Sequence, residues 1–117
     1  MPMTVVATRN VAPRVRGFLA SVMCEVAPGV YTAPRMSASV RERVWRVLRG
    51  WCSELTADQG LVMTWPDRKL PGGQEIRVLG GPPYELVEHD GVYLARTDLT
   101  QDERFQLARD ADEDTPF

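Results

Sequence analysis

Cysteine and histidine are scarce in this chain of 117 residues. It contains two cysteines, Cys24 and Cys52, and one histidine, His89. They form no CxxC spacing, and they are too few for the four-ligand set of a structural zinc site. Two cysteines also exclude a disulfide-stabilised scaffold. We therefore predict no metal site of this kind and a fold held together by its hydrophobic core.

Long apolar runs are missing as well. No apolar stretch reaches the roughly 18 residues that a membrane helix needs, and the first ten residues lack the basic segment and apolar core of a signal peptide. The sequence predicts a cytoplasmic protein with no membrane partner. With 44% hydrophobic and 26% charged residues, the composition is that of one globular domain.

Acidic residues are rare in the first part of the chain and abundant at its end. Residues 1–97 carry 12 Arg or Lys against 9 Asp or Glu, whereas residues 98–117 carry 2 against 7. This predicts a mildly basic domain over 1–97 and an acidic tail over 98–117 that docks on a partner or is flexible. Most cations are Arg, whose planar group suits phosphate, although a GC-rich genome produces the same bias.

Hydrophobic spacing in the first half predicts two strands and two helices. A β-branched run predicts a strand over 3–8, and apolar residues three and four apart predict a helix from Pro13 to the Pro28-Gly29 break. A short strand over 30–33 follows. A second helix is predicted to start near Ser37 or Ser39, since both are suitable N-caps and Ser39 with Glu42 fits a capping box. Its apolar stripe extends to Leu55, and Gly60 lies just past the end of the helix.

The second half reads as strands and turns. Residues 61–65 and 75–79 predict a hairpin, and one or two further short strands flank the turn at Asp90-Gly91. The order is that of an α+β, ferredoxin-like βαββαβ domain with extra C-terminal strands. Two helices cover only one face of such a sheet, so we expect a homodimer to cover the other.

Basic residues gather at the first junction between strand and helix. Arg9, Arg14 and Arg16 lie in a segment that has no acidic residue from Met1 to Phe18. Cations at a helix N-terminus oppose the helix dipole, whereas a phosphate is favoured there by the free amides and the guanidinium groups together. The alternatives are a phosphate-binding surface and a solvated basic face without a partner.

The other candidate residues have ordinary structural interpretations. The second predicted helix carries four arginines, of which Arg46 is expected to pair with Glu42 one turn earlier, and the rest form its solvated side or a second basic surface. The three tryptophans are interpreted as core or interface residues and His89 as solvent-facing. No nucleophile motif or nucleotide-binding loop occurs, so no catalytic residue is predicted. The arginines are Arg41, Arg43, Arg46 and Arg49.

These residues resemble a known family, the small CRISPR-associated protein Cas-two, in the subfamily of type I-E systems. The resemblance extends in the family's order over about residues 1–96. It is carried by Val5–Val11, Pro13–Gly17, Leu19, Glu25-Val26, Gly29–Tyr31, Ser37, Val40–Glu42, Trp45, Gly60, Val62–Trp65 and the Asp90-Gly91 turn.

The resemblance implies a ferredoxin-like homodimer that bridges two dimers of the CRISPR integrase Cas-one and holds a double-stranded DNA prespacer. Arg14 and Arg16 match family arginines that contact the duplex backbone, and Arg9 joins the predicted DNA-binding set. The family's arginine pair after the fourth strand is replaced by Pro82-Pro83-Tyr84, so Arg77 is the expected substitute. In the family, the C-terminal end of the chain docks on the integrase.

The family also implies an enzymatic alternative. Many members are metal-dependent endonucleases with an acidic residue at the end of the first strand, and that position is Arg9 here. A guanidinium group neither binds magnesium nor accepts a proton. We therefore expect a DNA-binding structural subunit without a cofactor. The alternatives are an endonuclease of RNA or DNA that uses magnesium, and a small regulatory or ligand-binding ferredoxin-like module.

Overall fold

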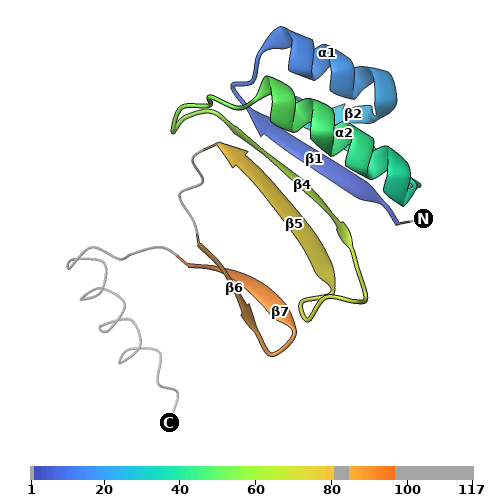
Figure 1. The fold of residues 1–117 in the computed structure, drawn as a ribbon, viewed down its shortest axis with the longest axis vertical. Coiled ribbons are helices and arrows are strands. Elements are labelled where there is room, and N and C mark those ends of the chain that lie inside the picture. Colours follow the sequence, from blue (N-terminus) through green and yellow to red (C-terminus); the bar gives the residue numbers. More distant parts are fainter. Residues whose placement is uncertain (1, 81–84, 97–117) are drawn as a thin grey trace, which may run out of the picture.

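The computed structural model describes residues 2–80 and 85–96 of the chain (Figure 1). The predicted acidic tail at 98–117 and the Pro82-Pro83-Tyr84 segment lie outside the described residues. No helix in the described part is long and apolar enough to cross a membrane. The elements are, in chain order, β1 (Thr4–Arg9), α1 (Pro13–Val22), β2 (Cys24–Ala27), β3 (Val30–Ala33), α2 (Ala38–Trp51), β4 (Gly60–Pro66), β5 (Gln74–Gly80), β6 (Glu85–His89) and β7 (Val92–Arg96).

The main sheet has five antiparallel strands in the order β2-β3-β1-β4-β5. β1 lies at its centre, where Val6 is opposite Tyr31 of β3 and Met63 of β4. The first six elements, β1 to β4 with α1 and α2, make the βαββαβ arrangement of the ferredoxin-like fold. β5 extends the sheet as the predicted hairpin partner of β4. The predicted α+β fold class is confirmed. β6 and β7 form the expected hairpin around Asp90-Gly91.

Both helices cover the same face of the main sheet (Figure 1). Leu19 of α1 and Leu48 of α2 are fully buried there, together with Val6 and Met63 of the central strands. Burying a side chain of this size stabilises a fold by about 1.5–3 kcal/mol. The register places Val6, Tyr31 and Met63 on this face, so their sequence neighbours point to the other one.

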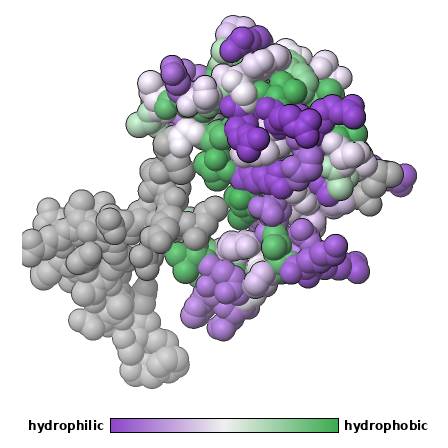
Figure 2. All heavy atoms as spheres, in the orientation of Figure 1, coloured by the Kyte–Doolittle hydropathy of each residue, from purple (hydrophilic) through white to green (hydrophobic). Residues whose placement is uncertain are grey.

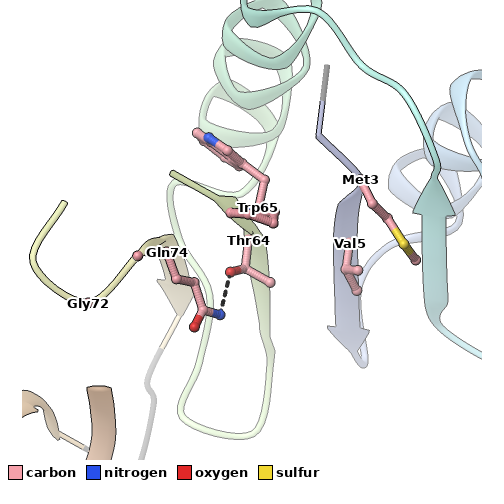
Figure 3. A pocket seen from close by; sticks show the side chains of 8 residues that line it. Met3, Val5, Thr64, Trp65, Gly72 and Gln74 are labelled. Atoms are coloured by element: carbon pink, nitrogen blue, oxygen red, sulfur yellow. Dashed lines mark hydrogen bonds between the residues drawn. The ribbon is translucent and has the colours of Figure 1, made fainter. Parts of the chain in front are cut away.

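The opposite face of the sheet is apolar and has no covering layer among the described residues. Val5, Val62, Ile76 and Val78 share this face, and Val78 is 37% exposed. A hollow of about 350 Å³ lies where β1 and β5 begin and β4 ends. There Gln74 Nε2 donates a hydrogen bond of 2.8 Å to Thr64 Oγ1, and Figure 3 shows these two side chains together. The hollow has no titratable side chain in its lining, which consists of Met3, Val5, Thr64, Trp65, Pro66, Gly72, Gly73 and Gln74.

The prediction that the first helix continues to Pro28-Gly29 is wrong. α1 ends at Val22, and the segment that follows is the edge strand β2, which pairs with β3. Val26 fits the apolar spacing of the helix but is 58% exposed. Gly29, with φ 77°, allows the tight turn between β2 and β3, so the break belongs to a hairpin. Pairing with β3 overrides the local helical pattern.

The second helix is shorter than predicted at its C-terminal end. Its N-cap is Ser37, whose Oγ accepts a hydrogen bond of 3.3 Å from the Val40 amide, so Ser39 is not the cap. The helix ends at Trp51, whereas Leu55 packs against the core from the following loop and Gly60 begins β4. A loop residue such as Leu55 can contact the core without being helical. The apolar pattern therefore overestimates the length of the helix.

Candidate nucleic-acid interface

The N-terminus of α1 has no negative charge to balance its dipole. Pro13 is at its first position, Ala12 is an N-cap without a capping side chain, and the first turn contains no acidic residue. The amides of Val15 and Arg16 both donate to Ala12 O, at 3.0 and 3.3 Å. Arg14 therefore lies, with Arg16, at a helix end that already carries partial positive charge. Such an end attracts an anion from outside the chain.

Arg14 rests on an aromatic platform that the other helix provides. Its guanidinium carbon is 5.1 Å from the centre of the Trp51 ring, at the last residue of α2. The ring of Phe18 packs edge-to-face with this indole, with ring centres 5.5 Å apart. Trp51 is 39% exposed, so it is an interhelical platform and not a fully buried core residue. The stacking orients a charge that has no ion-pair partner among the described residues.

Arg16 lies between two surface hollows, and its nearest acidic group is Glu25. The Gly29 amide donates a hydrogen bond of 3.1 Å to Glu25 Oε2. This bond, followed by the Tyr31 hydroxyl and the charge of Arg16, lowers the pKa of Glu25. Burial raises the pKa of Tyr31, which stays a neutral phenol at pH 7. The ionised Glu25 carboxylate therefore offsets part of the Arg16 charge, and Arg14 is the freer of the two cations.

Arg9 lies at the exposed end of β1 and is held against the loop that precedes β4. Its Nη2 donates to Ala57 O at 3.1 Å. The next residue, Asn10, has a left-handed backbone with φ 55°, and its Nδ2 donates to Asp58 O at 3.1 Å. One hollow of about 340 Å³ joins Arg9 to Arg16, and its lining consists of Thr8, Arg9, Asn10, Val11, Arg16, Pro28 and Gly29.

The end of β1 does not fit a divalent cation. Arg9 has no acceptor to offer, and Asn10, whose Nδ2 donates to Asp58 O, offers only a neutral amide oxygen. The nearest carboxylate, that of Asp58, accepts a hydrogen bond from the Thr56 hydroxyl, which lowers the pKa of Asp58. Within the described residues no three His, Cys, Asp or Glu side chains come together as a metal site. The described side chains at this end therefore lack the carboxylate set of a divalent-cation site.

Arg77 lies on the helix-covered face of β5, where its charge is paired. Its two terminal nitrogens donate to the carboxylate oxygens of Glu42 at 2.7 and 3.0 Å. The predicted pair between Glu42 and Arg46 is therefore wrong, because both oxygens bind Arg77 from across the structure. The guanidinium also lies over the rings of Trp65, at 4.9 Å, and Trp45, at 5.7 Å. Trp65 is buried and Trp45 half-buried, as expected for core residues.

The described residues thus form a ferredoxin-like protein in which Arg9 and Arg16 line one hollow and Arg14 lies in the first turn of α1, over Trp51. His89, in contrast, lies in the hairpin with a side chain 74% exposed, as predicted. Residues 3–94 match the model of a family described as CRISPR-associated protein (Cas_Cas2CT1978). Because the match covers most of the chain, the protein belongs to this Cas-two-like family. It is a CRISPR-associated protein.

Replacing Glu42 by Gln should lower the free energy of unfolding at pH 7 by less than about 1 kcal/mol, because the carboxylate is half-exposed. The hydrogen bonds from Arg77 lower the pKa of Glu42 from its ordinary value of 4.5. The stabilisation is thus fully present above pH 4.5 and disappears as the pH falls through the lowered pKa. Urea titrations at several pH values measure it. Glu54→Gln, an exposed carboxylate after α2, is the control, and an equal effect of both changes would contradict the prediction.

Proposed function

We propose that the protein is the structural, DNA-binding subunit of a type I-E CRISPR adaptation complex. In this function a homodimer bridges two dimers of the integrase Cas-one and holds the prespacer duplex for insertion. Family membership supports a role with other CRISPR-associated proteins. The observation that carries the DNA-binding part is the N-terminus of α1, where Arg14 and Arg16 add to the positive end of a helix that has no acidic residue in its first turn.

Such a surface suits the phosphate backbone of a duplex. Guanidinium groups bind phosphate with two parallel hydrogen bonds, and the free amides of a helix start add to the attraction. Arg9 is a further contact, since the hollow beside it is shared with Arg16. A phosphate contact by Arg77 requires this side chain to exchange Glu42 for the phosphate. Contacts of this kind position DNA without reading its sequence.

The open face of the main sheet supports the homodimer. Its valine and isoleucine side chains remain accessible in the single chain, with Val78 37% and Met3 48% exposed. Contiguous apolar surface of this kind is typical of interaction sites. A second copy of the chain presents the same face, and pairing the two faces about a two-fold axis covers both.

Replacing Arg14 and Arg16 together by Ala should weaken duplex binding by the protein assembled with its integrase about tenfold or more at 0.1 M salt, nearly independently of base sequence. The slope of log K against log salt should fall by about 2, because each phosphate contact contributes about 0.9. Fluorescence anisotropy with two unrelated duplexes measures both quantities. Arg68→Ala with Lys69→Ala, which removes two exposed charges from the β4–β5 loop, is the control. Equal affinity and an unchanged slope in the double variant at 14 and 16 would refute the DNA-binding surface.

The purified protein should show little or no metal-dependent nuclease activity. Arg9 occupies the position at which an acidic side chain is expected to bind the cation, and a guanidinium group repels it. Incubation with labelled DNA and RNA in magnesium or manganese, with and without chelator, tests this. Cleavage that requires the metal and disappears in Asp58→Asn would favour the endonuclease alternative instead.

Light scattering should give twice the mass of the chain at micromolar concentration. Val78→Lys should shift the protein toward the monomer, because it places a charge in the apolar face. Val40→Lys, which makes the same change at a helix residue of the same exposure, 37%, should leave the mass unchanged. A monomeric wild-type protein, or equal behaviour of the two variants, would argue against this dimer.

A further inference from the structure

Three arginines form a row along the outer side of α2, away from the residues just described. Arg43, Arg46 and Arg49 recur every three residues and are all exposed, whereas Val44 and Leu48 of the same helix point into the core. We call these three residues the α2 arginine row. Figure 2 shows hydrophilic side chains gathered over this helix.

No residue of the α2 arginine row forms an ion pair within the described part of the helix layer, although the charge of Arg46 contributes to the lowered pKa of Glu42. Glu42 is the one acidic residue in the sequences of α1 and α2, and both of its oxygens bind Arg77. None of the three arginines forms an ion pair within residues 2–80 and 85–96. Neighbouring like charges on a helix repel one another, so a bound external anion would relieve this repulsion.

The row lies on the same helix as the aromatic platform of the proposed DNA-binding end. α2 ends at Trp51, the ring on which Arg14 stacks, and Arg49 lies in the last turn before it. We propose that the α2 arginine row is a second contact for the phosphate backbone of the bound duplex. This inference rests on the proposed function, and it extends the interface from the N-terminus of α1 along α2.

The dimensions of the row suit a nucleic-acid strand. From Arg43 to Arg49 the helix axis rises about 9 Å, and the phosphates of one strand recur about every 3.4 Å along a duplex. The row thus spans two or three successive phosphates. Gly50 beside it and Gly17 on α1 both border open space, so no bulky side chain at these positions keeps a duplex away.

The composition of the outer side favours a phosphate backbone over an acidic protein. Val40, 37% exposed, is the one large apolar side chain among the exposed residues between Ser39 and Gly50. The others are Ser39, Glu42, Arg43, Arg46, Arg49 and Gly50. Protein interfaces generally have an apolar or aromatic centre within their polar rim, and a single partly exposed valine near the N-terminus of α2 does not form such a centre. A phosphate backbone needs only the guanidinium groups.

The test compares two triple variants of the full chain, assembled with its integrase, for binding to a labelled DNA duplex. Replacing the α2 arginine row by Gln should weaken binding about tenfold or more at 0.1 M salt and reduce the salt slope by about 3. Gln keeps the helix propensity of Arg, and circular dichroism checks the fold. The control removes the same charge at Arg35, Arg68 and Lys69, which are exposed and lie outside both helices, and its salt slope should stay within about 1 of the wild-type value.

The outcomes separate this inference from the proposed function. If Arg14→Ala with Arg16→Ala weakens binding but the row variant keeps wild-type affinity and slope, the second contact is refuted and the first one stands. If the row variant binds DNA normally but no longer retains the integrase, the row is a protein-binding surface and the inference is likewise overturned. A wild-type complex that does not bind the duplex refutes both.

Discussion

The fold depends on the burial of one face of the main sheet, whose central strand is β1. β1 runs parallel to β2, and β3 runs parallel to β4, because each pair has a common antiparallel neighbour. α1 and α2 are the crossovers of these two pairs, and since such crossovers are right-handed, both helices lie on the same face and share one core. Val6, Leu19, Leu48 and Met63 are fully buried in it. The same packing brings the last residue of α2 beside the first turns of α1, where Trp51 contacts both Arg14 and Phe18.

The packing of the helices on the sheet decides which charged side chains of the domain form ion pairs. The one acidic residue of the helices, Glu42, binds Arg77 from β5, and that pair also lies against the rings of Trp45 and Trp65. The other helix arginines form no ion pair in the described part of the chain, and Arg16 is partly offset by Glu25. A mildly basic domain thereby acquires a concentrated basic surface, which the net charge of −2 for the whole sequence conceals. Electrostatic attraction of a polyanion depends on this local concentration.

Much of the fold was predictable from local patterns. The strands at 30–33, 61–65 and 75–79, the start of α1 at Pro13 and the Asp90-Gly91 hairpin follow from alternation, proline and turn residues. β2 was missed because Met23 and Val26 continue the helical spacing of α1, and only pairing with β3 shows that the segment is a strand. The Glu42 pair was misassigned because a partner 35 residues away competes with the neighbour one turn away.

The sequence by itself determined which side chains are available: the arginines near the start of α1, the absence of nearby acidic residues, and Arg9 where the family expects a carboxylate. Those properties are local and chemical, so no packing changes them. The tertiary structure alone decided which cations are neutralised and which remain open. Arg77 forms an ion pair with Glu42, whereas Arg14 stacks on the ring of Trp51. Both contacts join residues that are distant in the chain and become adjacent only after the helices pack on the sheet.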